Sequence, residues 1–341
     1  MLSSQRLAGQ WFITRGTGLT KHRLTILGTV HPDAMALVEA RDDLDVTVVA
    51  EALAPRDEII EAIAGAHGIE VRTAKLDAEM LGAVEDLKIV SRHGVGTDSV
   101  AVDHMTARGL PVAIAIGGND RSVAEHTLTM ALHFARDMPL QHELGLAGDW
   151  SRRGELKAYD LEDRTMLIIG HGRIGSRVGE LARAFGMRVL AYDPYIGGVP
   201  HGIEHVSDMH AAMAEADIVT VHVPKYDETS PLIDETAVRA MRTDSILINN
   251  ARGGICDEPA VAAALHDGHL RGYGCDVFSV EPTPPDNPIL SAPNTLLSTH
   301  SASMTPQGMR RMGMIAIQNV LDCFDGKLNP EMVFNRKELG W

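Results

Sequence analysis

Three residues of complementary chemistry lie in the second half of the chain, each shortly after an apolar segment of strand-like length. They are Arg252, Glu281 and His300. A guanidinium group can hold a carboxylate through two parallel hydrogen bonds, and an imidazole exchanges a proton near neutral pH when a carboxylate orients it. Because the carboxyl ends of parallel strands share one edge of a sheet, the three side chains can converge there. The pattern predicts a site that binds an acid and transfers a proton.

A glycine-rich turn precedes these residues. Residues 170–175 read Gly-His-Gly-Arg-Ile-Gly, after an apolar strand and before an amphipathic helix, and Asp193 ends the next predicted strand. Gly170 permits a tight turn, Gly172 lets a pyrophosphate approach the backbone, and Gly175 lets helix and strand pack closely. Asp193 can accept hydrogen bonds from ribose hydroxyls, and its charge repels a 2′-phosphate. The turn therefore predicts NAD, in preference to NADP, as the cofactor.

The elements that must position these groups are short apolar strands that alternate with helices over the whole chain, a pattern typical of α/β folds with parallel sheets. A first series of predicted strands covers 24–28, 46–50, 69–72, 88–91 and 112–115. A second series covers 166–169, 188–192, 218–223, 245–249, 272–275 and 295–298, and six strands complete a dinucleotide-binding sheet. The S-x-x-E spacing at 122–125 predicts the start of a long helix, and the helical run 306–324 is expected to pack on the first domain.

Composition limits the classes of function. The chain has 341 residues with 31 basic and 46 acidic side chains, a net charge of −15, which disfavours binding to nucleic acid or acidic membranes. The three cysteines, Cys256, Cys275 and Cys323, are far apart and predict neither a metal site nor disulfides, so the cytoplasm is the expected compartment. Residues 1–23 carry cations without an acid and are expected to form a surface extension.

The motifs and their order resemble the NAD-dependent D-isomer-specific 2-hydroxyacid dehydrogenase family. The similar segments are the glycine turn, residues 94–98, Asn119 with 122–126, 222–224 with Thr229, 248–254, 274–278 with Glu281 and Pro282, and His300. The resemblance implies hydride transfer between NAD(H) and C2 of a D-2-hydroxy or 2-oxo acid in a cleft between two domains. It implies that Arg252 binds the carboxylate and polarises the carbonyl, with His300 as general acid and base assisted by Glu281.

Further binding residues follow from the resemblance. The cofactor set is Gly170, Gly172, Arg173, Ile174, Gly175, Asp193, His222, Pro224, Thr229, Ala251 and Asp276. The expected substrate contacts are the backbone N–H groups of Val95 and Gly96, together with Arg252 and Arg92. Asn250 stands where a small hydroxyl residue is common in the family, which bears on the substrate and not on the reaction.

The resemblance also implies a domain organisation. We expect a discontinuous flavodoxin-like substrate domain from 1–118 and 302–341, and a Rossmann NAD-binding domain from 119–301. A homodimer is expected around the helix that begins near Ser122, because its apolar surface is predicted to exceed what one domain can cover.

Several alternatives stay open from the sequence. The substrate can be hydroxypyruvate, glyoxylate or 3-phosphoglycerate, since Arg72, Lys75 and Arg92 at predicted strand ends could reach a second anionic group. Formate oxidation on the same fold is disfavoured because Glu281 is a carboxylate and not an amide. A different class of function is an NAD(H)-sensing corepressor-like binding protein on the same fold.

Overall fold

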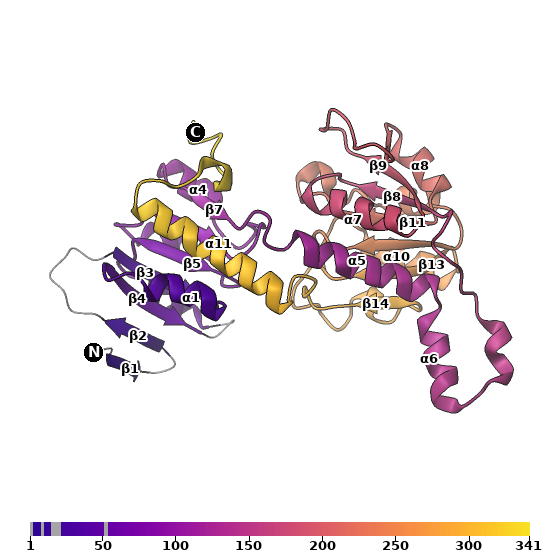
Figure 1. The fold of residues 1–341 in the computed structure, drawn as a ribbon, viewed down its shortest axis with the longest axis horizontal. Helices are drawn as coiled ribbons and strands as arrows, with labels where there is room; N and C mark the ends of the chain where they lie inside the picture. The colour runs from indigo at the N-terminus through magenta and orange to yellow at the C-terminus, as the bar shows by residue number, and fades with distance from the viewer. Residues whose placement is uncertain (1–2, 8–9, 15–21, 51–53) are drawn as a thin grey trace. The chain divides into compact units, whose positions relative to one another are not determined.

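A computed structural model describes residues 3–7, 10–14, 22–50 and 54–341 (Figure 1). The chain divides into two compact units. Unit 1 comprises Met1–Asn119 together with Thr305–Trp341, and unit 2 comprises Asp120–Met304. The first unit is thus discontinuous in sequence, as expected from the helical run after residue 305.

Unit 1 is a doubly wound sheet with the strand order β1-β2-β4-β3-β5-β6-β7. The strands β3 to β7 run parallel and have the flavodoxin-like order 2-1-3-4-5. Its elements are β1 Ser3–Leu7, β2 Gln10–Thr14, β3 His22–Leu27, α1 Pro32–Glu39, β4 Leu44–Val49, α2 Arg56–Ile63, β5 Gly68–Val71, α3 Ala78–Gly82, β6 Ile89–Arg92, α4 Val102–Ala107, β7 Val112–Ile114 and α11 Pro306–Phe324. Helix α11 packs on α1, β5, β6 and β7.

Unit 2 is a Rossmann sheet with the strand order β10-β9-β8-β11-β12-β13-β14, all parallel. The order reverses between β8 and β11, which is where such sheets bind dinucleotides. Its elements are α5 Asp120–Ala135, α6 Met138–Ala147, β8 Thr165–Ile169, α7 Arg173–Ala184, β9 Arg188–Tyr192, β10 Glu204–Val206, α8 Met209–Glu215, β11 Ile218–Val221, α9 Glu235–Ala240, β12 Ser245–Asn249, α10 Glu258–His266, β13 Leu270–Cys275 and β14 Thr295–Leu297.

The central strands of both sheets are buried on both faces, which explains their continuous apolar sequences. Every residue of β8, β11 and β12 is buried. Aspartates and a threonine begin several of the covering helices, where their side chains accept a hydrogen bond from a first-turn N–H. These caps are Asp77, Asp208, Asp234, Asp257 and Thr305.

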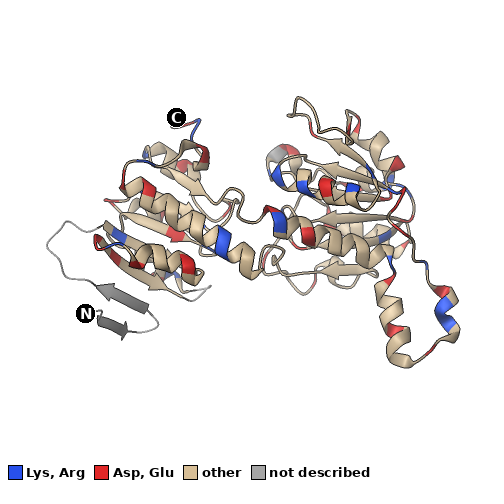
Figure 2. Ribbon diagram, viewed as in Figure 1, with Lys and Arg blue, Asp and Glu red and all other residues tan. Residues whose placement is uncertain are grey.

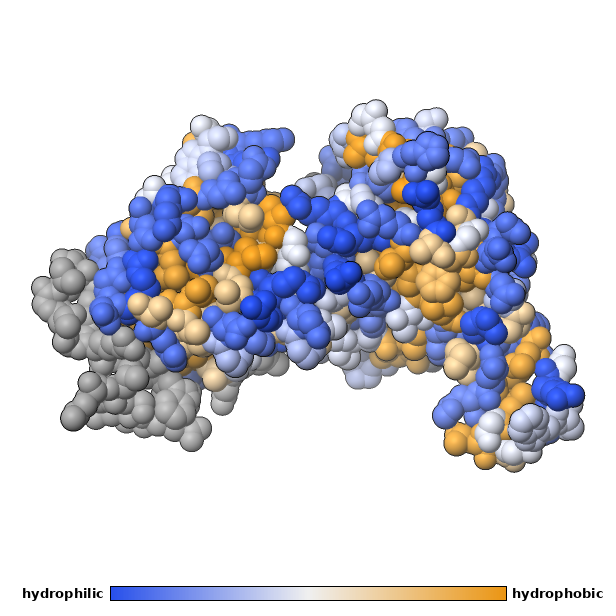
Figure 3. Space-filling model, in the orientation of Figure 1, coloured by the Kyte–Doolittle hydropathy of each residue, from blue (hydrophilic) through white to orange (hydrophobic). Residues whose placement is uncertain are grey.

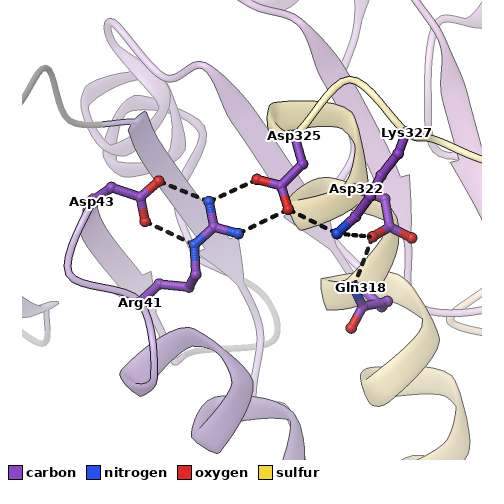
Figure 4. A network of polar contacts seen from close by, with 6 residues as sticks. All are labelled: Arg41, Asp43, Gln318, Asp322, Asp325 and Lys327. Carbon is purple, nitrogen blue, oxygen red and sulfur yellow. Dashed lines mark hydrogen bonds and ion pairs between the residues drawn. The ribbon is translucent and has the colours of Figure 1, made fainter.

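Side-chain networks on the helix surfaces complete the fold. Acidic and basic residues are interspersed on the outer faces of the helices within each unit (Figure 2). In unit 1, Arg41 binds Asp43 and Asp325 at once, at 2.7 and 2.9 Å, and Lys327 lies 3.0 Å from Asp325 (Figure 4). The network fastens the end of α11 to the loop between α1 and β4.

The structure corrects four expectations about the elements. Unit 2 has a seventh strand, β10, which is short and largely exposed and so carries no apolar pattern. Strands β1 and β2 pair antiparallel, and β2 joins β4 antiparallel, where a plain surface extension was expected; residues 15–21 lie outside the described residues. Helix α5 begins at Asp120, so Ser122 is a buried residue of its first turn and not a cap. The buried side of α5 packs inside its own unit, so the premise of the dimer prediction is wrong.

The described helices contain no segment that is both long and apolar enough to cross a membrane.

Candidate active site

The predicted histidine and glutamate are hydrogen-bonded to each other. His300 Nδ1 lies 2.8 Å from Glu281 Oε2, and the other carboxylate oxygen of Glu281 accepts the backbone N–H of Phe278 at 2.9 Å. The His300 side chain is 51% exposed and that of Glu281 is 36% exposed. Because Nδ1 is held by the carboxylate, Nε2 is the ring nitrogen left to meet a substrate.

The pair shifts both pKa values toward the charged forms. The hydrogen bond that His300 donates to Glu281 raises the pKa of His300. The Glu281 charge reinforces this shift, and partial burial and the charge of Arg252 oppose it. Partial burial acts to raise the pKa of Glu281, but the hydrogen bonds from His300 and Phe278 outweigh it and the pKa is lowered. The imidazole is therefore kept in a form that can donate a proton toward neutral pH.

Arg252 is carried by the loop after β12, and that loop is fixed by Asn249. The Asn249 side chain accepts the N–H of Ala251 at 3.1 Å and donates to the carbonyl of Arg252 at 3.0 Å. The Arg252 guanidinium contacts the carbonyl of Ala251, and its charge acts on both Glu281 and His300. The structure thus brings together the three residues of the predicted triad within unit 2.

The loop that carries His300 is held by the buried carboxylate of Asp276, at the end of β13. Its oxygens accept the N–H groups of Ser301 and Ala302 at 2.8 and 2.9 Å and the Ser298 hydroxyl at 2.6 Å. The N–H of His300 donates to the backbone carbonyl of Asp276 at 2.7 Å. His300 itself has φ +53°, a left-handed conformation that non-glycine residues adopt only where their surroundings enforce it.

The glycine turn has the geometry of a pyrophosphate cradle. Gly170 has φ +91°, and a Cβ there would lie 2.8 Å from the backbone of His222. A Cβ on Gly175 would lie 2.1 Å from the Gly170 carbonyl, so the helix approaches the strand closely. At Gly172, which begins α7, a Cβ would meet nothing within 4 Å. The helix start is thus open to an incoming phosphate group, and the site fits a dinucleotide.

Asp193 lies just beyond β9, at the carboxyl edge of the sheet. Its oxygens accept the N–H groups of His171 and Tyr195, both at 3.0 Å. These bonds fix the carboxylate beside the glycine turn, and a carboxylate retains further lone pairs for ribose hydroxyls. The placement agrees with the role predicted for this residue, which stays a prediction.

Comparison with known proteins places the chain. Residues 128–302 match the family model described as D-isomer specific 2-hydroxyacid dehydrogenase, NAD binding domain. A D-3-phosphoglycerate dehydrogenase of Methanocaldococcus jannaschii is 33% identical over 91% of this chain and 59% of its own length. An (S)-sulfolactate dehydrogenase of Chromohalobacter salexigens is 34% identical over 84% of this chain and 94% of its own. The chain belongs to the D-isomer specific 2-hydroxyacid dehydrogenase family.

A solved structure supports the same assignment for the fold. D-lactate dehydrogenase from Aquifex aeolicus, complexed with NAD and lactic acid, superposes with a TM-score of 0.79 at 27% identity, covering 91% of this chain and 98% of that chain. This chain spans 59%, 52% and 53% of the length of three phosphoglycerate dehydrogenases that it matches. Residues 128–302 form the family's NAD-binding domain in this chain.

The other residues that the family resemblance assigned to the cofactor lie near the same edge of unit 2. Arg173 and Ile174 open α7, and Pro224 follows β11. The Thr229 hydroxyl donates to the carbonyl of Pro224 at 2.8 Å and accepts the N–H of Tyr226. His222 directly follows β11; burial lowers its pKa to about 3, and its Nε2 lies 2.9 Å from Thr220 Oγ1.

In unit 1, the residues assigned to the substrate carboxylate follow β6. Within the described part of the chain, no hydrogen bond uses the N–H groups of Val95 or Gly96. Arg92 also holds this loop. Its Nε donates to the carbonyl of Gly96 at 2.7 Å and its Nη1 to the carbonyls of Val71, at 3.0 Å, and Arg72. The guanidinium thus shapes this loop of the family's fold, because its Nε and Nη1 donate to backbone carbonyls.

Sequence reasoning missed the residues that support the loops carrying His300 and Arg252. Ser298 and Asn250 each contact a side chain of α5 and stand close to His300 and Arg252 in sequence. A signal was present: both are polar residues that directly follow a strand of the cofactor sheet, as Asp276 does. In this family's fold such positions lie at the edge where chemistry takes place.

Proposed function

We propose that this chain is an NAD-dependent dehydrogenase that moves a hydride between NAD(H) and C2 of a D-2-hydroxy or 2-oxo acid. The observation that carries the proposal is the 2.8 Å hydrogen bond between His300 and Glu281, with Arg252 close enough for its charge to act on both. This combination supplies a proton donor and a carboxylate-binding cation at one edge of a dinucleotide-binding sheet. No observation favours a corepressor-like role.

Each residue of the site has a separate role in the proposed reaction. Arg252 binds the substrate carboxylate and draws electron density from the C2 oxygen, and the N–H groups of Val95 and Gly96 hold the carboxylate. His300 donates its Nε2 proton to that oxygen during reduction and takes it back during oxidation. The cofactor, when bound, supplies or accepts the hydride. Glu281 holds the ring through Nδ1 and stabilises its cationic form.

The reaction is tested by following NADH absorbance with a panel of 2-oxo acids. We expect turnover of at least one of glyoxylate, hydroxypyruvate and 3-phosphohydroxypyruvate, with the D-hydroxy acid as product. If the purified full chain bound NADH but turned over no 2-oxo acid, the proposal would be overturned and a sensing role favoured.

A second anionic group on the substrate is the more specific form of the proposal. Arg72 follows β5 and lies 3.4 Å from the Thr29 hydroxyl, and Lys75 is exposed three residues later. The names of the relatives, phosphoglycerate and sulfolactate dehydrogenases, fit an acid that carries a phosphate or sulfonate. With Arg92 directed to backbone carbonyls, Arg72 is the residue proposed to bind this group.

Replacement of Arg72 by alanine tests this assignment. The KM for 3-phosphohydroxypyruvate should rise by about tenfold or more, since a charge-assisted hydrogen bond contributes about 1.5–3 kcal/mol, while the KM for glyoxylate stays unchanged. Lys75→Ala is the matched control for a nearby cation. Equal effects of Arg72→Ala on both substrates would assign Arg72 to the loop structure.

The cofactor preference is tested at Asp193. We propose that Asp193→Ala relaxes the preference for NADH over NADPH, because it removes the ribose acceptor and the charge that repels a 2′-phosphate. The measurement is the ratio of kcat/KM for the two cofactors. An unchanged ratio would refute the role of Asp193.

We also propose a homodimer. Its contact is proposed to lie not on α5 but on the arm, which is the segment formed by α6 and the following residues to Glu155. The arm leaves unit 2 after α5 and extends away from its sheet (Figure 1). Met138, Leu146 and Trp150 on it are 46%, 78% and 79% exposed. Hydrophobic residues, drawn in orange, lie on the surface of this arm (Figure 3). Sedimentation should give a dimer that Leu146→Glu with Trp150→Glu dissociates; a monomeric parent protein at micromolar concentration would overturn this.

The cytoplasm is the proposed compartment. All three cysteines are free, and Cys256 and Cys275 are buried. Localisation of the tagged chain checks this.

A further inference from the structure

Two adjacent residues of α5, His126 and Thr127, each reach a different catalytic loop of unit 2. His126 Nε2 lies 3.0 Å from the hydroxyl of Ser298, two residues before His300. Thr127 Oγ1 lies 3.0 Å from Asn250 Nδ2, two residues before Arg252. The helix is firmly seated, because its Val123, Leu128 and Ala131 are buried.

The proton count along the first contact fixes its direction. An ionised carboxylate only accepts hydrogen bonds, and Asp276 Oδ1 receives the single hydroxyl proton of Ser298 at 2.6 Å. The Ser298 oxygen can therefore only accept from His126, so the His126 ring carries its proton on Nε2. The result is a directed chain from His126 through Ser298 to Asp276, which also binds the N–H groups of Ser301 and Ala302.

The second contact is directed in the same way. The Thr127 hydroxyl donates its proton to the carbonyl of Val123 at 2.9 Å, so its oxygen accepts from the Asn250 amide. Thr127 is fully buried and Asn250 is 6% exposed. A buried hydrogen bond of this kind holds the start of the Arg252 loop against the helix, since losing one partner leaves the other unsatisfied.

The two contacts act at the points from which the geometry of each loop is set. His300 has a left-handed backbone, and the N–H groups on its carboxyl side are bound by the carboxylate of Asp276. Rotation of that carboxylate would release the segment and move the imidazole. Arg252 likewise follows a short turn whose fixed points are the side chains of Asn249 and Asn250.

We propose that His126 and Thr127 are positioning residues that brace the proton donor and the carboxylate-binding arginine from one helix. The proposal rests on the proposed function of His300 and Arg252. The His126–Ser298–Asp276 chain sets the position of the imidazole, and the Thr127–Asn250 bond sets that of the guanidinium. We expect different kinetic effects from breaking the two contacts, because His300 and Arg252 have different proposed roles.

The His126–Ser298–Asp276 chain is tested with His126→Phe, Ser298→Ala and Ser298→Thr. His126→Phe keeps a ring without a donor, and we expect kcat for reduction to fall by about 10- to 100-fold, as for a small misplacement of a catalytic group, with the Kd of NADH unchanged. Ser298→Ala should lower kcat similarly, and Ser298→Thr, which keeps the hydroxyl, should restore it. The pH profile should keep its position, because the Glu281 charge beside His300 is untouched.

The Thr127–Asn250 bond is tested by comparing Thr127→Val with Thr127→Ser. Valine preserves the shape without an acceptor, and we expect the KM for the 2-oxo acid to rise several-fold because Arg252 is displaced; serine should leave it near the parent value. Thr129→Val is the control on the same helix, since Thr129 is exposed and its hydroxyl bonds only within the helix, to the carbonyl of Glu125.

A readout independent of turnover separates this proposal from the proposed function. Amide hydrogen exchange at 298–302 should be faster in His126→Phe and Ser298→Ala than in the parent and in Thr129→Val. Unchanged exchange together with unchanged kcat would overturn the brace. Faster exchange in a chain that turns over no 2-oxo acid would support the brace and count against the proposed function alone.

Discussion

The two units each contain a histidine hydrogen-bonded through Nδ1 to a glutamate. In unit 1 His93 lies 2.9 Å from Glu70, and in unit 2 His300 lies 2.8 Å from Glu281. Both side chains of the first pair are 0% exposed, whereas those of the second are 51% and 36% exposed. The same chemical pair can therefore stabilise a core in one place and exchange protons with a substrate in another.

The surroundings account for the difference. Glu70 lies on a central strand, and a Cβ on Gly313 of α11 would come within 3.1 Å of the His93 ring, so helix and sheet close over the pair. Glu70 Oε2 and His93 Nε2 have no hydrogen-bond partner among the described residues. His300 instead lies on a loop beside Arg252, with its second nitrogen available. Exposure and a neighbouring cation, and not the pair itself, distinguish the histidine proposed as proton donor.

The largest effect expected from this contrast is on turnover. His300→Ala should lower kcat by about 10²–10⁴-fold, the usual contribution of general acid catalysis, and leave the Kd of NADH nearly unchanged. Steady-state kinetics and fluorescence titration of NADH measure both quantities. A variant that retained more than a tenth of the parent kcat would remove His300 from the role of proton donor.

The next effect is on the pH dependence of turnover. Glu281 raises the pKa of His300, so reduction, which needs the protonated ring, is lost as pH rises through that raised value. Glu281→Gln should move the alkaline limb of reduction to lower pH by about 1–3 units, the usual effect of a paired carboxylate, and allow oxidation at lower pH. Glu70→Gln is the matched control and should leave both limbs in place. Identical profiles for Glu281→Gln and the parent would disprove the charge coupling.

The buried pair should show the opposite balance, with an effect on stability. Glu70→Leu leaves His93 buried without its partner, and we expect a loss of about 1–3 kcal/mol in the free energy of unfolding. Glu281→Leu, at a partly exposed position, should cost less than about 1 kcal/mol. Urea unfolding with hydrogen exchange followed in β5 and β6 measures the difference. Equal losses in the two variants would break the comparison.

The smallest effect is expected at the surface network of unit 1. The hydrogen bonds from Arg41 and then Lys327 lower the pKa of Asp325 to about 2. Its contribution to stability is therefore present above the unfolded pKa near 3.8 and is lost as pH falls toward 2. Arg41→Ala should lower the stability at pH 6 by less than about 1 kcal/mol and flatten the fall of Tm below pH 4. An unchanged acid slope would show that the network does not act on Asp325.

Much of this architecture could be predicted because it rests on local patterns. The parallel strands β3 to β9 and β11 to β14 lie within a few residues of the apolar segments predicted for them, and α11 spans the predicted helical run. The glycine turn can be predicted because Gly170, Gly172 and Gly175 lie within six residues, between a strand and a helix. The family assignment is confirmed by the comparisons.

What the sequence did not show depends on contacts between distant segments. Strand β10 is polar and forms only because β9 offers an open edge. The role of Arg92 in shaping its loop depends on the carbonyls of Val71, Arg72 and Gly96, which no motif encodes. The brace on α5 joins residues 172 and 123 positions apart, and only the folded sheet brings them together.

The return of residues 305–341 to unit 1 has a consequence for how the protein is made. Val333 pairs with Ala113 beside β7, the Asn335 side chain accepts the N–H of Val112, and α11 covers the same sheet. A ribosome delivers these residues only after the whole of unit 2 has emerged. Unit 2 can therefore fold during synthesis, whereas one face of the unit 1 sheet stays exposed until α11 has been made. We expect chains truncated before residue 305 to aggregate through that apolar face while keeping a folded nucleotide domain.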